Sequence, residues 1–460
     1  MNRSSIEPRA QAPIDAIGPD TADTADAPDG RAAPDAADDA DDAAGTTLAG
    51  PTPASTSAPT GPLASIVPGG PHEPTKTRLA AAVDFARDEI LELSHRIHAH
   101  PEPAFEEERA ATWIAEILGR HGFAIEHPAG SLPTAIRATR RGGRSGPGPR
   151  IGILAEYDAL PGLGHGCGHN TMAASGVGAA IALASLAGEL AGEIVFLGTP
   201  AEERGSGKQI MIDDGLFEGI DAALLFHPCD RNHVESHPLA SEDVEVVYHG
   251  LQAHAAADPW KGRNALDALI LLFSSVGLWR QQLRTDVRVH GIIQEGGTAA
   301  NIIPERTRAW FMLRSPDQAY YEQMKTRFQA LVEGAALATD TTAEITFSGG
   351  SRTMKSNPTL EARWVANATA YGIVDQGPDP NSGSTDMANV SWVCPTIHPE
   401  LSIAPEGTPG HSILFRDAAA TPAADATTLL AAVLVAQTAY ELFADPELLA
   451  SAWRDFRAED

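Results

Sequence analysis

The sequence predicts an α/β protein whose central sheet is flanked by helices and which carries an inserted, ferredoxin-like α+β domain. Two patterns support this prediction: apolar, strand-like runs alternate with helical segments, and residues 241–350 follow the order β-α-β-β-α-β. The length of 460 residues and the 43% hydrophobic content allow more than one buried core. We expect a tail (1–76), a main domain in two parts (77–240 and 351–460) and the inserted domain (241–350).

The first segment, residues 1–76, is dominated by Ala, Pro, Asp, Thr and Gly and includes the run "PDAADDADDAAG". It has no hydrophobic periodicity that could offset the conformational entropy lost on folding. We therefore predict a disordered acidic tail. Such a tail is either a solubilising or interaction arm or an extension without a role.

The main domain begins with a helical pattern over residues 77–102, where apolar residues recur every three or four positions. Three apolar runs follow, "RIGILAEYD", "GEIVFLGTP" and "AALLFHP", separated by helical segments. Such runs are typical of strands in a buried, largely parallel sheet, where ligands gather at the carboxyl ends of the strands. The polar residues at these ends are therefore candidates for a site: Glu156 and Asp158, then Glu202 and Glu203, then His227.

The inserted domain is predicted from six consecutive segments. They are strand "EDVEVVYHG", helix 263–284, strand "DVRVHGIIQEG", strand "RTRAWFMLRS", helix 316–338 and strand "TAEITFSGG". This order is the split βαβ, or ferredoxin-like, arrangement. The helix and strand patterns after residue 350 are expected to complete the main domain.

Charge and hydropathy limit the partners. The formal net charge of -28 at pH 7 argues against nucleic acid and anionic membranes, because a phosphate-binding surface needs a basic stripe and none is evident. The apolar stretches 171–187 and 425–443 are interpreted as buried helices, since the first is rich in small residues and the second has polar interruptions. We expect a small-molecule substrate, no nucleic acid and no membrane.

The three cysteines, Cys167, Cys229 and Cys394, are too few for a disulfide framework, and no charged segment followed by an apolar one stands near Met1. We therefore expect a cytoplasmic protein. Cys229 and Cys394 are interpreted as structural residues.

Candidate metal ligands stand at the ends of successive strands. They are Cys167, His169, Glu203 and His227, with His411 far downstream in "GTPGHSILF". Thiolate, imidazole and carboxylate together suit zinc best. Any one of these residues alone is more often structural, so the prediction depends on their coincidence at strand ends.

The stretch "GTPAEE" places two carboxylates, Glu202 and Glu203, at a strand end. They form either a solvated acidic face or a pair in which one carboxylate binds a metal and the other acts as general base. No serine or cysteine arrangement for nucleophilic catalysis competes, and no Walker loop or dinucleotide fingerprint is present. Water activated by a metal is therefore the expected nucleophile.

Seven motifs in order resemble those of the aminoacylase and carboxypeptidase-G family of metallopeptidases, over roughly residues 80–445. They are "AEYDALPGLGHGCGHN", "GTPAEE", "HP", "AHAAADPWKGRNALDA", "GTAANIIPE", "GSTDMANVS" and "GHS". Within the family they most resemble p-aminobenzoyl-glutamate hydrolase and the aminoacylase-like dipeptidases. Seven motifs in the right order are a specific signal.

The resemblance implies a role for each matching residue. The implied metal ligands are Cys167, His169, Glu203, His227 and His411, with Glu202 as the catalytic base. The main domain then corresponds to the catalytic domain and the insertion to the lid and dimerisation domain. In that domain, His254 matches a histidine that polarises the scissile carbonyl, and Asn301 matches a substrate-binding asparagine; both can act across a dimer.

Two departures from the family pattern affect the ligand set. Many relatives have His-x-Asp where this chain has Glu156-Tyr157-Asp158, so the usual first histidine ligand is absent and Cys167 supplies a ligand in its place. Asp158 is then expected to orient a ligand without binding the metal. Asn170 stands where the related auxin-conjugate amidohydrolases have Asp, which favours the branch of p-aminobenzoyl-glutamate hydrolase and the dipeptidases.

The sequence thus predicts a metal-dependent amidohydrolase or dipeptidase that cleaves small N-acyl amino acids or dipeptides. We expect one or two Zn²⁺ ions per chain, with Mn²⁺ or Co²⁺ as alternatives, and a homodimer formed through the lid domain. A free carboxylate on the substrate is expected to bind Arg314, at the end of the strand "RAWFMLRS". The alternative is a non-catalytic metal-binding or regulatory relative, although no predicted ligand position, nor the base, is lost.

Overall fold

The computed structural model describes residues 57–378 and 383–458. The chain divides into two units, Met1–Thr52 and Pro53–Asp460, and every described residue lies in the second. Most of the predicted tail is therefore outside the described residues. Its predicted end at residue 76 is wrong, because Leu63 is buried in the core and the first α-helix begins at Glu73. The sequence assigns the short apolar segment "GPLASIVP" to the tail because its prolines and glycine are typical of disordered segments.

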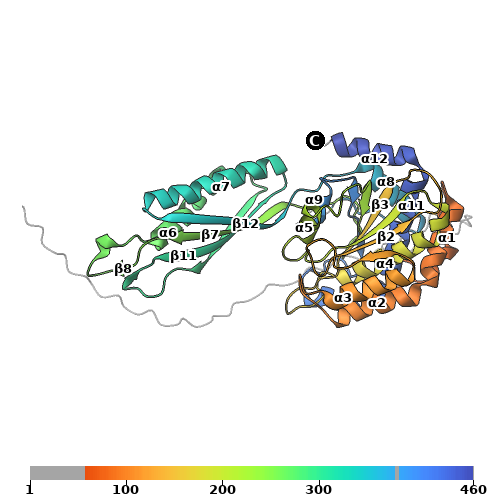
Figure 1. Ribbon diagram of the computed structural model, residues 1–460, viewed down its shortest axis with the longest axis horizontal. Coiled ribbons are helices and arrows are strands. Elements are labelled where there is room, and N and C mark those ends of the chain that lie inside the picture. Colours follow the sequence, from red (N-terminus) through yellow and green to blue (C-terminus); the bar gives the residue numbers. More distant parts are fainter. Residues whose placement is uncertain (1–56, 379–382, 459–460) are drawn as a thin grey trace, which may run out of the picture. The chain divides into compact units, whose positions relative to one another are not determined.

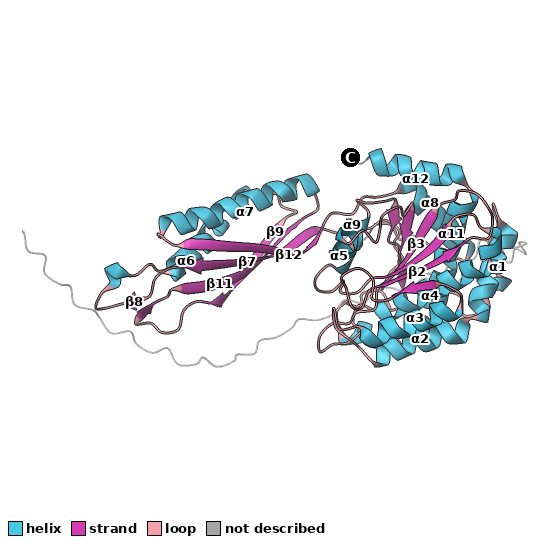
Figure 2. Cartoon of the chain, in the orientation of Figure 1, coloured by secondary structure: helices cyan, strands magenta, loops and turns pink. Residues whose placement is uncertain are grey.

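The main domain is built around a six-stranded sheet (Figures 1 and 2). The strand order is β1 (Ala124–Glu126), β2 (Ile136–Arg141), β4 (Glu193–Gly198), β3 (Arg150–Ala155), β5 (Ala222–Leu224) and β13 (Thr396–Ile397). Strands β4, β3, β5 and β13 are parallel, whereas β2 runs antiparallel to β4. A separate parallel pair joins β6 (His227–Cys229) to β14 (Glu400–Ser402). The carboxyl ends of β3 and β4 thus lie side by side, as predicted.

Helices complete this domain. They are α1 (Glu73–Phe85), α2 (Arg87–Ala99), α3 (Glu108–Arg120), α4 (His169–Ser185), α5 (Gly207–Asp213), α8 (Pro358–Ala370), α9 (Met387–Val390), α10 (Ile413–Ala418), α11 (Pro422–Ala444) and α12 (Pro446–Ala458). Helices α4 and α11 pack against each other and are buried almost throughout. Among the described helices, α11 is the one long and apolar enough to cross a membrane, but 89% of its most apolar window is buried inside the protein.

The helix predicted over residues 77–102 is in fact two helices, α1 and α2, which meet at Ala86. The buried positions Leu79, Val83, Ile90 and Leu93 keep helical spacing across the break. Hydrophobic periodicity therefore could not reveal it. Both helices pack on α4.

The inserted domain has the predicted topology. Its sheet has the order β12 (Thr342–Ser351), β7 (Ala240–His249), β11 (Arg306–Ser315) and β9 (Arg288–Glu295), all antiparallel. Helices α6 (Ala265–Trp279) and α7 (Gln318–Ala338) share a core with alternate β7 residues such as Val244 and Val246, so both pack on one face of the sheet. A short ribbon joins β8 (Ala253–His254) to β10 (Ile302–Ile303).

Candidate metal centre

Cys167 and His169 are placed by the loop that leads from β3 into α4. Gly168 precedes the helix with φ 76°, a left-handed conformation that favours glycine. A Cβ at Gly168 would lie 2.8 Å from Cγ of Pro228, the residue after His227. Glycine is therefore required both for the turn and for the close approach of β6.

Asp158 fixes the orientation of His169. Its Oδ1 lies 2.9 Å from His169 Nδ1, and its backbone oxygen lies 3.1 Å from the same nitrogen. Its second oxygen, Oδ2, accepts a hydrogen bond of 2.9 Å from the backbone N–H of Glu203. Because Nδ1 is engaged, His169 presents Nε2 to any cation, which is the arrangement expected of a ligand held by a carboxylate.

The carboxylate loop after β4 is held in a similar way. Ala201, directly before Glu202, is left-handed with φ 61°. Its N–H donates to Oε1 of the fully buried Glu107 at 2.9 Å. Glu107 and Asp158 thus hold the backbone on either side of Glu202.

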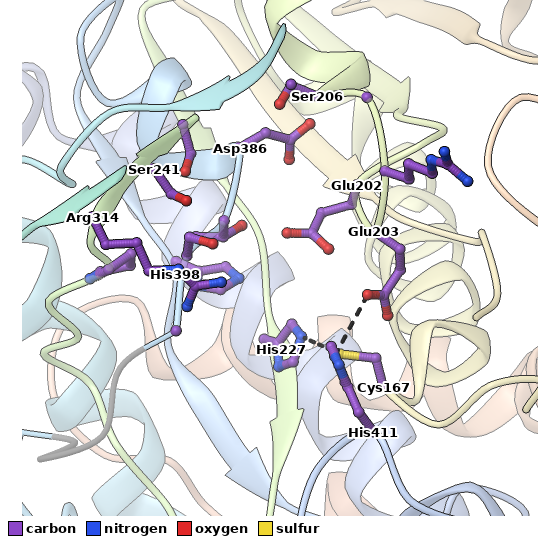
Figure 3. Close-up of a pocket in the computed structure, with 18 of the residues that line it drawn as sticks. Cys167, Glu202, Glu203, Ser206, His227, Ser241, Arg314, Asp386, His398 and His411 are labelled. Atoms are coloured by element: carbon purple, nitrogen blue, oxygen red, sulfur yellow. Dashed lines mark hydrogen bonds and ion pairs between the residues drawn. The ribbon is translucent and has the colours of Figure 1, made fainter. Parts of the chain in front are cut away.

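The five predicted ligands form two groups that share Cys167. One group contains Cys167, His169 and His227, and the other contains Cys167, Glu203 and His411; within each, the ligand atoms all lie within 4.8 Å of one another. Cys167 Sγ is 3.5 Å from His227 Nε2, and Glu203 Oε2 is 3.5 Å from His411 Nε2 (Figure 3). These residues converge from β6, α4 and loops that are far apart in the sequence.

Two buried atoms at this centre, His169 Nε2 and Glu203 Oε1, make no hydrogen bond to any described residue. Buried polar atoms normally have partners, so these two indicate a place for a further group. One thiol, three imidazoles and a carboxylate are a donor set that suits zinc and its neighbours. The residues therefore fit a divalent metal in each group.

The pKa shifts of the ligand side chains show that a cation would stabilise their metal-binding forms. Burial and the nearby Glu203 raise the pKa of the Cys167 thiol, so a thiolate would need a cation for stability. Burial opposes protonation of His169, but Cys167 and Asp158 outweigh it and raise the pKa of His169 well above its usual value. Burial lowers the pKa of His227 to about 3, which keeps its imidazole neutral and able to bind a metal.

Glu202 lies beside the two groups and lines the same cavity as Cys167, Glu203, His227 and His411 (Figure 3). This cavity has a volume of about 480 Å³. Burial, followed by the neighbouring Glu156 and Glu203, raises the pKa of Glu202 well above its usual value. A carboxylate with a raised pKa beside a cation site is suited to accept and release a proton.

The three predicted site residues of the inserted domain differ in whether they line the cavity at the metal centre. Arg314 lines the cavity, whereas His254 and Asn301 are not among its described lining residues. Those two lie next to each other, since the Ala255 N–H donates to the Asn301 oxygen at 3.0 Å. The His254 ring nitrogen Nδ1 accepts hydrogen bonds from the N–H groups of Ala256 and Ala257.

Three residues at the site were missed by sequence reasoning. His398 lines the cavity, is buried, and neither of its ring nitrogens bonds to a described residue. Lys208 is fully buried between Glu156 and Asp386, at 2.5 Å from an oxygen of each. Burial would raise the pKa of Glu156, but Lys208 and the nearby histidines outweigh it and lower the pKa to about 2. Asp386 stands within the quoted motif "GSTDMANVS", which was the one available signal for this cluster.

Comparisons with known proteins agree with this geometry. Residues 152–431 match the model of peptidase family M20/M25/M40. The chain is 37% identical over 407 residues to Xaa-Arg dipeptidase of Mus musculus, which covers 84% of this chain and 92% of that protein. It is 28% identical over 445 residues to one of the chains of p-aminobenzoyl-glutamate hydrolase of Escherichia coli strain K12, which covers 80% of this chain and 92% of the relative.

A solved structure shares the fold. It is a dinuclear metal-binding peptidase of Bacillus subtilis, with a TM-score of 0.57 and 22% identity over 77% of this chain and 99% of the other. The two-domain fold and the resemblance read from the motifs are thus confirmed. The family match and the relative that is 37% identical lead to one conclusion: this chain belongs to peptidase family M20/M25/M40.

Proposed function

We propose that this chain, a metal-dependent hydrolase of amide bonds, releases the C-terminal residue of dipeptides and N-acyl amino acids that carry a free carboxylate. One observation carries the proposal: Arg314 and Glu202 line a single cavity together with four of the five ligand residues, Cys167, Glu203, His227 and His411. A guanidinium can bind a carboxylate through two parallel hydrogen bonds, which would fix the amide bond relative to the ligands. The names of the two relatives describe substrates of this kind.

The roles of the residues follow from their positions. When bound, a divalent metal supplies Lewis-acid polarisation of the scissile carbonyl and lowers the pKa of a water molecule. Glu202 accepts the proton of the attacking water and later donates it to the leaving amine, for which its raised pKa is suited. Asp158 keeps His169 Nε2 directed at the metal. Two metals per chain are proposed, because the two ligand groups share only Cys167.

We propose further that the released residue is basic. Five carboxylate residues and two arginines line the cavity: Glu202, Glu203, Asp243, Asp386 and Glu400, with Arg204 and Arg314. Glu202 and Glu203 belong to the proposed base and the metal centre, and Asp386 pairs with Lys208, so the proposal depends on Asp243. Asp243 is on β7, opposite Met312 of β11, and its Oδ1 makes no hydrogen bond to any described residue. A lysine or arginine side chain of the substrate would supply the missing partner.

The test is a hydrolysis screen of the metal-loaded protein on alanyl-arginine, alanyl-leucine, β-alanyl-lysine, p-aminobenzoyl-glutamate and the carboxamide of alanyl-arginine. We expect the basic dipeptides to be cleaved fastest and the carboxamide slowest. Asp243→Asn should lower kcat/KM for alanyl-arginine but leave alanyl-leucine nearly unchanged. Equal turnover of alanyl-arginine and its carboxamide would refute the role of Arg314, and equal losses on both dipeptides would refute that of Asp243.

We also propose a homodimer formed through the lid domain. The outer side of α6 exposes Ile270, Leu271 and Leu278, which a second copy would cover. The positions of His254 and Asn301 outside the described cavity lining support a role in the site of the second copy. Mixing His254→Ala with Glu202→Gln chains should then restore up to roughly a quarter of wild-type sites. A monomeric active protein, or hybrids without recovery, would refute this arrangement.

We also propose a cytoplasmic location, because the metal centre needs Cys167 to stay reduced.

A further inference from the structure

A buried ionic cluster lies directly behind the metal centre. Lys208 Nζ is 2.5 Å from Glu156 Oε1 and 2.5 Å from Asp386 Oδ1, and the Lys208 N–H donates to Asp386 Oδ2 at 2.9 Å. The three residues are at most 2% exposed. Burying three charges is costly unless each is paired, so a cluster of two anions and one cation leaves one negative charge that needs a further partner.

The second oxygen of Glu156 is not used by this cluster. Glu156 Oε2 is buried and makes no hydrogen bond to any described residue, and the same is true of His169 Nε2. The two atoms lie 3.2 Å apart. Together with a carboxylate oxygen of Glu202 they form a third group whose atoms all lie within 4.8 Å of one another. Ligand atoms of one metal are separated by similar distances, because each lies about 2.0–2.2 Å from the ion.

We propose that Glu156 is a direct ligand of the metal bound by His169 Nε2, and that Lys208, held by Asp386, positions Glu156 for this role. The inference rests on the proposed metal-dependent function. It differs from the expectation from the sequence, in which Cys167 takes the place of the missing histidine ligand. Lys208 binds Oε1, which leaves Oε2 directed at His169, so the lysine selects which oxygen faces the metal.

The competing explanation is that Glu156 serves only to neutralise Lys208. Asp386 provides the matched control, because it also contacts Lys208 Nζ at 2.5 Å but belongs to none of the three ligand groups. Glu156→Gln and Asp386→Asn therefore remove the same kind of charge from Lys208. Only Glu156→Gln alters the oxygen beside His169.

The experiment loads the metal-free full-length protein with Co²⁺ and records visible absorption and affinity by competition with a chelator, in the absence of substrate. Glu156→Gln should shift the Co²⁺ absorption bands and weaken Co²⁺ binding by about 10- to 100-fold. Asp386→Asn should keep the wild-type bands and lose less affinity. If Glu156→Gln keeps the wild-type spectrum and affinity, or if both variants change the spectrum alike, Glu156 is not a ligand.

Folding must be separated from ligation, since a buried charge without a partner can unfold the chain. Glu156→Gln leaves Lys208 paired with Asp386, so the metal-free variant should keep a thermal midpoint close to that of the wild type. The triple variant Glu156→Gln, Lys208→Met and Asp386→Asn removes every charge of the cluster and should still show the altered Co²⁺ spectrum. A wild-type spectrum in the triple variant would overturn the inference. A wild-type protein that binds no Co²⁺ would instead refute the proposed function itself.

Discussion

Replacing Gly168 by alanine tests how the turn before α4 supports the metal centre. An L-residue with φ near 76° costs roughly 1–2 kcal/mol. The new Cβ would lie 2.8 Å from Pro228 Cγ and 3.3 Å from Ile403 Cδ1. The Pro228 ring is rigid, so relief requires movement of β6, at about 1–3 kcal/mol for overpacking. The total loss in the free energy of unfolding is about 2–5 kcal/mol.

The matched control is Gly162→Ala in the same loop, where φ is 73° but no atom lies within 4 Å of the added Cβ. Thermal unfolding of the metal-free proteins should give a lower midpoint for Gly168→Ala than for Gly162→Ala. Because Pro228 follows His227, Gly168→Ala should also weaken metal binding by about tenfold, whereas the control should not. Equal midpoints and equal metal affinities in the two variants would show that the contact with Pro228 has no consequence.

Three further predictions concern the base, the N-terminus and pH. Glu202→Gln should keep its metal but lose at least about 10²-fold in kcat, and near-normal turnover would exclude it as the base. Deleting residues 1–56 should leave the melting temperature unchanged, whereas deleting residues 1–70 should cost about 1.5–3 kcal/mol because Leu63 is buried; equal midpoints would contradict this. Burial and Asp158 raise the pKa of Glu107 to about 7 from 4.5, so the folded protein keeps a proton that the unfolded chain releases. The free energy of unfolding should therefore fall between those pH values by at most about 3 kcal/mol, and Glu107→Gln should abolish this fall in a denaturant titration.

The site residues that could be predicted from the sequence are those that follow the ends of strands. Glu203 and His227 follow the strands β4 and β5 within a few residues, and Cys167 ends the loop that leads from β3 into α4, so the sheet topology brings all three to one edge. The topology of the lid domain was also predictable, because each of its helices and strands has a hydrophobic pattern of its own.

The rest depends on contacts between distant residues that have no local pattern. Lys208 is 52 residues from Glu156 and 178 from Asp386, and a lone lysine in "GSGKQ" resembles any surface lysine. Lys208 is buried because α5 packs against α9, and no local sequence pattern predicts this contact between distant helices. The break at Ala86 is hidden for the opposite reason, since helical spacing continues through it.

The charge balance at this edge of the sheet links metal binding to protons and to stability. In the metal-free chain, burial raises the pKa values of Glu202, Glu203 and the Cys167 thiol, and the neighbouring Glu156 and Glu203 raise that of Glu202 further. These groups therefore retain protons that bound cations would displace. Metal binding should release protons, and the affinity should rise with pH as those groups ionise. Calorimetric titration with Zn²⁺ in two buffers of different ionisation enthalpy measures the number released, and a value of zero would show that the ligands are already deprotonated in the metal-free protein.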